Sequence, residues 1–316
     1  MYVKYSYDDF HFTTSTQTAA FGDFPWRGEP QHWSVPQFLE YLDEYIAHFG
    51  FKQHMRFNAK VEKVTQTTTA AGTKVWRLMV HYKKWNHRSE FPLTMEASTM
   101  DLQERREVYT CDHIVAATGT HNKWQLPKIP GRKQCAGRHY HSSEFHRLAR
   151  SGELAGRHVL LVGLGESGCD LAKLAAAAVA LPPGGGAVSV SVPRHSGVYF
   201  PREFEGSPAD TLDSRLLYGS ARWPTHLVVR HTFRRRFLRH SYDKDAMAAA
   251  AAANYQSQRT AMNSFGVKTL DLFNAAATCS NVRMVPAAVK AFEADGTAVF
   301  SDGTKLLPDV VIFCTG

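Results

Sequence analysis

The sequence predicts an α/β fold, and three observations lead to that class. A Val- and Leu-rich run of strand length at residues 158–162 leads into a glycine-rich turn at 163–168, and a helical Ala/Leu/Lys pattern follows. Residues 56–82 contain two alternating segments, as an antiparallel β meander does. Residues 112–119 and 309–316 are apolar runs that begin with Asp and end in Thr-Gly. Such strands end at the sheet edge where α/β proteins bind ligands.

The glycine turn has the form G-x-G-x-x-G, which signals dinucleotide binding when a strand precedes it and a helix follows. Gly163 would make the tight turn, Gly165 would let a pyrophosphate approach the backbone, and Gly168 would let the helix pack close to the strand. The phosphates would then lie on free N–H groups at the positive end of the helix dipole. The alternative is a strand–helix turn that only tolerates glycine.

The end of the next strand indicates which dinucleotide binds. Residues 187–192 predict that strand, and an NAD or FAD site usually ends it with Asp or Glu. This chain has Pro193-Arg194-His195 there, and a cation pairs with the 2′-phosphate of NADP(H). We therefore expect NADP(H), with Arg194 as the phosphate contact. The alternative is a solvated loop arginine.

Length and charge limit the classes of partner. A chain of 316 residues has room for one large or two medium domains with real cores. The net charge of +8 is compatible with nucleic acid, with an anionic membrane, or with two phosphate-rich cofactors. The densest basic cluster, residues 230–239, carries Phe and Leu at helical spacing and favours a solvated helix. We expect no nucleic-acid partner.

Cysteine usage and the N-terminal residues indicate the compartment. The five cysteines are scattered, odd in number and free of C-x-x-C pairs, which is typical of reduced thiols inside a cell and indicates no metal site. The first ten residues lack the charged and apolar regions of a signal peptide. No apolar stretch reaches the length that spans a bilayer. We expect an intracellular, cytoplasmic protein.

Residues 34–50 predict a helix ahead of the meander. Ser34 is a good N-cap, Pro36 falls in the first turn, and Gly50 ends the pattern. The apolar side chains that recur at helical spacing, predicted as core, are Phe38, Leu39, Leu42, Tyr45, Ile46 and Phe49.

Two Thr-Gly strands frame the glycine turn. Residues 108–117 predict a buried strand that runs into Thr118 and Gly119, and its twin at 309–316 would enter the same sheet from the far end of the chain. The remaining predictions are a helix at 243–258 with a six-Ala run, strands at 282–289 and 291–300, and a hairpin turn at Asp302-Gly303.

These pieces resemble the flavin-containing monooxygenases. In that family a fingerprint F-x-G-x-x-x-H-x-x-x-(F/Y/W) links the flavin and NADPH domains. Here it stands as Cys135-x-Gly137-x-x-x-His141-x-x-x-Phe145, with Cys135 in place of the first aromatic residue. His146 follows Phe145 where the Baeyer–Villiger branch has Pro, which favours the heteroatom-oxidising branch.

Other matches run in family order over nearly the whole chain, and their positions are 21–25, 38–50, 112–119, 163–170 and 309–316. The resemblance implies a two-dinucleotide-binding-domain, FAD/NAD(P)-binding Rossmann-like architecture with a β meander. Its implied division is a partial FAD-binding domain at 1–150, an NADP-binding domain at 151–285 and strands at 286–316 that return toward the FAD domain. Besides the glycines and Arg194, the implied cofactor-binding residues are Glu166, Ser167, Asp170, Thr118, Gly119, Gly137 and His141.

Two departures from the family pattern stand out. The family begins with its own G-x-G-x-x-G turn for the FAD pyrophosphate, whereas no such motif precedes Gly163, and the chain stops at Gly316 within a strand. We therefore expect an architecture incomplete at both ends. The family also places an Asn near the flavin ring, and the matching positions here hold Thr13 and Thr14, which become the candidate catalytic residues.

The resemblance implies a function. NADPH would reduce FAD, the reduced flavin would activate O₂, and a small-molecule nucleophile, an amine nitrogen or a sulfide sulfur, would take one oxygen atom. His141 would act as a structural hinge and not as a base. The alternatives are a non-catalytic NADP(H)-binding module and a related Baeyer–Villiger or N-hydroxylating monooxygenase. Membrane association stays open, because some relatives carry an anchor beyond the point where this chain ends.

Overall fold

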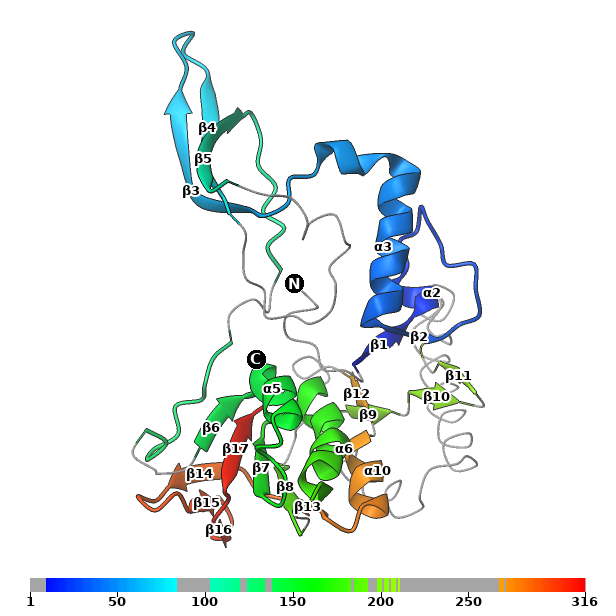
Figure 1. Ribbon diagram of the computed structural model, residues 1–316, viewed down its shortest axis with the longest axis vertical. Helices are drawn as coiled ribbons and strands as arrows, with labels where there is room; N and C mark the ends of the chain where they lie inside the picture. Colours follow the sequence, from blue (N-terminus) through cyan, green and yellow to red (C-terminus); the bar gives the residue numbers. More distant parts are fainter. Residues whose placement is uncertain are drawn as a thin grey trace, which may run out of the picture. The chain divides into compact units, whose positions relative to one another are not determined.

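The computed structural model describes residues 10–83, 103–119, 124–133, 138–182, 185–192, 198–200, 202–204, 206–208, 210, 267–269 and 271–315. The chain divides into two compact units (Figure 1), which are Met1–Ser6 with Val35–Asn122 and Tyr7–Ser34 with Lys123–Gly316. The predicted helix at 243–258 and basic cluster at 230–239 lie outside the described residues. The division at residues 150 and 285 stays a prediction.

The first unit begins with the predicted helix, α3 (Val35–Phe49), which Gly50 ends in the left-handed conformation at a φ of 68°. The prediction that its apolar face is core is only partly right. Phe49 is exposed and the other residues of that face are half-buried, while Val35 and Tyr41 are buried. Phe49 packs instead on neighbouring rings, with centroids 4.8 Å from Tyr45 and 5.7 Å from Phe51.

The predicted β meander is confirmed. Its strands are β3 (Ala59–Thr68), β4 (Lys74–Tyr82) and β5 (Arg105–Cys111), all antiparallel. The buried ring of His81 lies between two carboxylates, with Nδ1 2.8 Å from Glu62 and Nε2 2.6 Å from Glu104. Because Glu62 is on β3 and Glu104 precedes β5, this one ring links all three strands.

The prediction of a strand over residues 108–117 is wrong beyond Cys111, where β5 ends. Antiparallel pairing of β5 with β4 ends where Cys111 lies opposite Trp76. Residues 112–119 have no regular structure, and Val115 is 90% exposed. A parallel strand needs a neighbour to accept its backbone hydrogen bonds, and this segment pairs with no strand in the described part of the chain.

The second unit is built on a parallel sheet of the order β13-β8-β7-β17-β6. Its strands are β6 (Arg138–His141), β7 (His158–Val162), β8 (Ala187–Ser191), β13 (Val282–Val285) and β17 (Val310–Phe313). The predicted strands at 158–162 and 187–192 are thereby confirmed. The second Thr-Gly run contains β17, which pairs with β7 and β6. The prediction that this run shares a sheet with residues 112–119 is therefore wrong for the described residues. Residues 310–313 belong instead to the sheet that carries the glycine turn.

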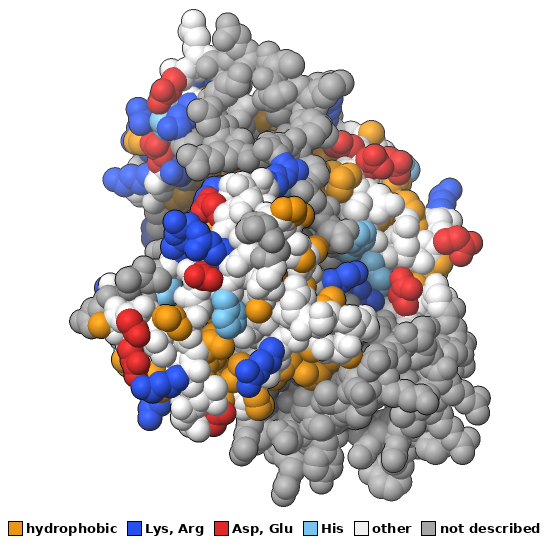
Figure 2. Space-filling model, turned by 60° about the horizontal axis from the view of Figure 1, so that its bottom comes forward, with side chains coloured by type: hydrophobic (Ala, Val, Ile, Leu, Met, Phe, Trp, Pro, Cys, Tyr) orange, Lys and Arg blue, Asp and Glu red, His pale blue; other side chains and the backbone are white. Residues whose placement is uncertain are grey.

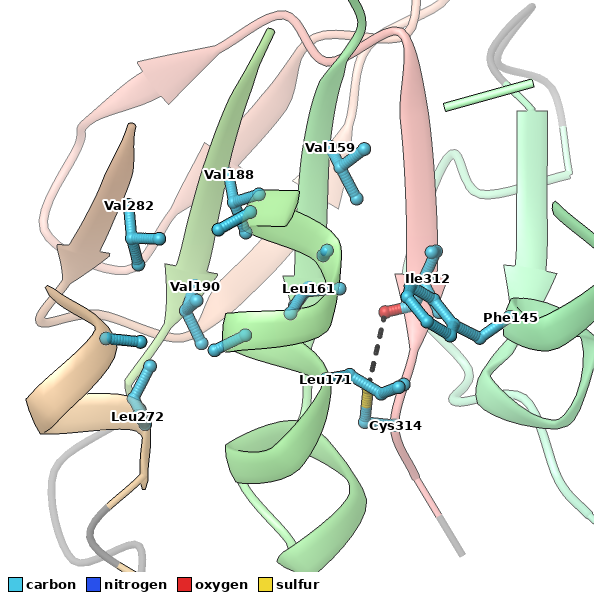
Figure 3. Close-up of a cluster of buried hydrophobic side chains, with 14 of the residues drawn as sticks. Phe145, Val159, Leu161, Leu171, Val188, Val190, Leu272, Val282, Ile312 and Cys314 are labelled. Carbon is cyan, nitrogen blue, oxygen red and sulfur yellow. Dashed lines mark hydrogen bonds between the residues drawn. The ribbon is translucent and has the colours of Figure 1, made fainter. Parts of the chain in front are cut away.

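Strand residues alternate between two apolar cores, one on each face of this sheet. Val159, Leu161 and Ile312 contact the helical side, shown in Figure 3. That side is formed by α5 (Phe145–Arg150), α6 (Glu166–Ala180) and α10 (Asp271–Thr278). Leu160, Val162, Val311 and Phe313 contact the opposite side, formed by the small antiparallel sheet β14 (Val289–Phe292), β15 (Ala298–Phe300) and β16 (Lys305–Leu306).

Short elements complete the second unit. They are β1 (His11–Ser15), α2 (Thr16–Ala19), β2 (His32–Ser34), β9 (Val198–Phe200), β10 (Glu203–Phe204), β11 (Ser207–Pro208) and β12 (Val267–Thr269). β1 pairs with β2 in antiparallel fashion, and β12 pairs with β9 in parallel. Among the helices described, none has the length and apolar character needed to cross a membrane.

The burial of Cys314 at the end of β17 gives a chemical test of the sheet. Burial raises the pKa of this thiol to about 12, and its weak contact is with the carbonyl of Ile312, 4.0 Å away (Figure 3). Because the thiolate is the reactive form, we expect iodoacetamide at pH 8 to leave Cys314 unmodified in the native protein. Half-buried Cys279 is the internal control and should react faster by peptide mass spectrometry. Equal native rates at the two thiols would contradict the packing of β17.

Candidate functional site

Two of the three turn glycines are required by the fold itself. Gly163 follows β7 with a φ of 107°, and a Cβ there would lie 2.8 Å from the carbonyl oxygen of Cys314. A Cβ on Gly168, in the first turn of α6, would lie 2.2 Å from the carbonyl oxygen of Gly163. Both distances are too short for a real carbon–oxygen contact, so strand, turn and helix close on one another only with glycine at these positions.

Gly165 is different, because the protein leaves it open. Its φ of −84° suits any residue, and the nearest atom to an added Cβ would be the Cys314 oxygen at 3.8 Å. The first hydrogen bond of α6 runs from the Cys169 amide to the Gly165 carbonyl at 3.1 Å. Amides N-terminal to that bond point out of the helix end. The open glycine and the outward amides form a cradle that suits a phosphate group.

The cradle lies at the switch point of the sheet. The chain passes from β7 to β8 and β13 on one side, whereas β17 and β6 lie on the other side of β7 (Figure 1). In open α/β sheets, ligands bind outside the carboxyl ends of the strands at such a switch point.

His141 joins two strand ends at the same edge of the sheet. Its Nε2 donates to the carbonyl of Thr315 at 2.8 Å, and its Nδ1 accepts the Ser143 amide at 3.2 Å. The ring stacks on Trp124 with centroids 5.3 Å apart, and the His141 amide donates to Glu144 at 3.3 Å. Both ring nitrogens are engaged, so the geometry gives His141 a structural link from β6 to the end of β17 and not the environment of a free base.

The candidate catalytic residues lie on β1, where Thr13 is half-buried and Thr14 is exposed. Arg202 links β1 to α6, the helix that follows the glycine turn. Its Nη1 donates to the carbonyl of Phe12 at 3.0 Å, and its Nη2 donates to Asp170 of α6 at 2.7 Å. No sequence signal singled out Arg202, because no motif surrounds it.

The described part of this site does not include the remaining sequence-predicted residues. Thr118 and Gly119 belong to the other compact unit and lie in an exposed segment without regular structure. Gly137 and Arg194 fall outside the described residues. By contrast Gly163, Gly165, Glu166, Ser167, Gly168 and Asp170 form one continuous turn and helix start. The preference for NADP(H) over NAD, which depends on Arg194, stays a prediction.

The charged side chains around this unit are mixed in sign. Figure 2 shows Lys and Arg interspersed with Asp and Glu over the described residues of one face. Arg147 pairs with Glu153 at 2.6 Å, and Lys305 pairs with Glu293 at 2.5 Å. Within the described ranges, no His, Cys, Asp and Glu side chains gather in a group of three that could hold a metal ion.

Comparison with known proteins agrees with this architecture. The family model for flavin-binding monooxygenase-like proteins matches residues 6–316. Flavin-containing monooxygenase 5 of Mus musculus is 24% identical over 317 residues, covering 98% of this chain and 52% of that protein. Monooxygenase PC-14 of Penicillium crustosum is 29% identical over 168 residues, covering 53% of this chain and 24% of that protein. The chain thus spans about half the length of flavin-containing monooxygenase 5, and its match covers about a quarter of monooxygenase PC-14.

Solved structures show the same fold. A polycyclic ketone monooxygenase from Thermothelomyces thermophila superposes with a TM-score of 0.62 at 14% identity, covering 98% of this chain and 55% of that one. The OTEMO complex with FAD and NADP gives a TM-score of 0.57 at 18% identity, covering 99% of this chain and 64% of that one. These likenesses confirm the predicted α/β architecture. The family match over residues 6–316 identifies the lineage: the chain belongs to the flavin-binding monooxygenase-like family.

Proposed function

We propose that this chain is part of a flavin-dependent monooxygenase that uses NADPH, FAD and O₂ to insert one oxygen atom into a soft nucleophile, an amine nitrogen or a sulfide sulfur. Family membership supports the reaction class. The observation that carries the nucleotide site is Gly165, an open glycine between two glycines that the fold requires. A turn that merely tolerated glycine would have no reason to keep this middle position free of side chain.

The chain's own residues would hold the nucleotide and shape the site. Gly165 and the outward amides of α6 would bind the pyrophosphate, with Glu166, Ser167 and Asp170 beside it. Arg194 would pair with the 2′-phosphate. When bound, NADPH supplies a hydride and FAD supplies the oxygen activation. The described residues contain no second glycine cradle of this kind, so FAD contacts by Thr118, Gly119 and Gly137, and a role for Thr13 and Thr14 near the flavin, are proposed from the family resemblance.

The proposed partners are a small-molecule nucleophile and O₂, with no nucleic acid. A cytoplasmic location is part of the proposal and is supported by the cysteines. Among the described residues, Cys111, Cys169, Cys279 and Cys314 form no disulfide bond, and reduced cysteines are typical of a reducing compartment.

Gly165→Ala separates nucleotide binding from folding. An added methyl group fits the protein but occupies the space of the phosphate, so NADP⁺ affinity should fall at least about tenfold while stability changes by less than about 1 kcal/mol. Gly168→Ala should instead destabilise the fold by about 2 kcal/mol or more, because its Cβ meets the Gly163 carbonyl. Calorimetric titration and thermal unfolding measure the two effects.

Lys173→Ala, at an exposed position of α6, is the matched control and should change neither quantity. Unchanged NADP⁺ affinity in Gly165→Ala would show that the nucleotide does not bind at this turn.

Arg194→Ala tests the choice of nucleotide. A guanidinium that pairs with the 2′-phosphate favours NADPH alone, so the variant should lose about 10- to 100-fold in NADPH affinity and keep its NADH affinity. Fluorescence titration with both nucleotides measures the ratio. An equal loss for both, or no loss for either, would contradict a 2′-phosphate contact.

The second candidate function is a non-catalytic NADP(H)-binding module. It is supported by the cradle at Gly165, which would bind a nucleotide whether or not the protein also holds a flavin. The two candidates differ in flavin binding. For the monooxygenase we expect the purified protein to take up FAD, become yellow and oxidise NADPH faster with a tertiary amine or a sulfide than without.

A panel that adds a cyclic ketone and a primary amine distinguishes the heteroatom reaction from the Baeyer–Villiger and N-hydroxylating alternatives. Tight NADP⁺ binding by a colourless protein that takes up no FAD would establish the binding module and reject the enzyme.

A further inference from the structure

We propose that Arg202 is a positioning residue that couples the nucleotide turn to the segment carrying Thr13 and Thr14. The nucleotide part of this inference rests on the proposed function. The structural part rests on the described contacts of Arg202 and of Asp210, two residues that lie close together in the chain and contact β1 near its two ends.

Arg202 holds two elements with one guanidinium. Nη2 donates to Asp170 Oδ1 at 2.7 Å, and Nη1 donates to the carbonyls of Phe12 at 3.0 Å and His11 at 3.4 Å. The side chains of Arg202 and Asp170 are only 18% and 9% exposed. A partly buried, charge-assisted pair of this kind is stronger and better ordered than a surface ion pair. The planar fork therefore fixes β1 against α6.

Asp210 holds β1 on the other side of the two threonines. Its Oδ2 accepts the Ser15 amide at 2.6 Å and also the hydroxyl of Thr18. The backbone is thus held at the carbonyl that precedes Thr13 and at the amide that follows Thr14. Their backbone position is set by two side chains almost two hundred residues away.

A third contact ties the same segment to β2. The ring Nε2 of His32 lies 3.0 Å from the carbonyl oxygen of Arg202, and β2 pairs with β1. The backbone of Arg202 is therefore fixed as well as its side chain. Movement of Arg202 would disturb both strands of the pair.

The coupling follows from the position of Asp170. It lies five residues after Gly165 in the early turns of α6, and a helix moves as a rigid element. A phosphate that shifts or orders the N-terminus of α6 also moves Asp170, and Arg202 transmits this movement to the carbonyl of Phe12. A lysine at position 202 would keep the positive charge but would lack the planar guanidinium group that contacts both elements, because an ammonium group is a single point of attachment.

Hydrogen–deuterium exchange of the full chain without nucleotide tests the clamp. In Arg202→Met we expect the amides of residues 11–18 to exchange about tenfold faster or more, since a charge-assisted hydrogen-bond network is lost. The strands β7 and β8 should keep their protection. Arg157→Met is the matched control, because Arg157 pairs with Asp309 at 3.8 Å and both side chains are about half-exposed. Unchanged exchange at residues 11–18 would overturn the clamp.

Adding NADP⁺ tests the coupling. In the wild type we expect new protection at residues 163–170 and also at residues 11–18. Arg202→Lys should keep the first and lose the second at an unchanged melting temperature, a result that a purely structural role would not give. Asp210→Asn, which loosens β1 without touching Asp170, should keep nucleotide-induced protection at residues 11–18.

The outcomes separate the two proposals. Equal protection of residues 11–18 in the wild type and Arg202→Lys would overturn the coupling while leaving the nucleotide site in place. No protection at residues 163–170 in the wild type would overturn the nucleotide site and the coupling together, and the nucleotide-free experiment would still decide the clamp. If Arg202→Met does not fold, Arg202→Lys should still show faster exchange at residues 11–18 without nucleotide, and its absence would overturn the clamp.

Discussion

The close approach of the glycine turn to the end of β17 is the contact on which the site depends. The carbonyl of Cys314 lies where a side chain on Gly163 would be, and the Gly163 carbonyl lies where a side chain on Gly168 would be. The Cys314 amide in turn donates to the Val162 carbonyl at 2.7 Å. Strand, turn, helix and neighbouring strand are therefore locked at one point. Of the three turn glycines, Gly165 is the one that could carry a Cβ without a clash.

Other elements join this point through single side chains. His141 holds the Thr315 carbonyl, the residue after Cys314, from the end of β6. Arg202 and Asp170 attach β1 to α6. The two apolar cores on the faces of the sheet keep the strands in register, so these polar links act at a rigid edge. The polar contacts thus position the residues of the site, while burial of the two apolar cores stabilises the fold.

Local patterns in the sequence predicted the local structure well. The strand–glycine–helix unit, the meander and the helix ended by Gly50 each carry their signal within a few neighbouring residues. Strand partnership could not be predicted in this way. Residues 112–119 and 309–316 look alike in sequence, yet the second run pairs with β7 and β6, whereas the first pairs with no strand in the described chain. The two runs differ in their neighbouring strands and not in their amino-acid pattern.

The missed residues of the site share one property, which is contact across a long stretch of sequence. Arg202 reaches Phe12 and Asp210 reaches Ser15, and neither lies in a recognisable motif. His141 was identified through its family fingerprint, but its partner Thr315 was not, because only the adjacency of β6 and β17 brings them together. Such pairs follow from topology, which single-sequence patterns specify weakly.

The most direct test of the account is an NADP⁺ titration of the ¹⁵N-labelled chain followed by amide chemical shifts. We expect the largest shift changes at the amides of Glu166, Ser167 and Gly168, since these N–H groups would bind the pyrophosphate. Changes confined to other parts of the chain, or none at saturating nucleotide, would contradict it.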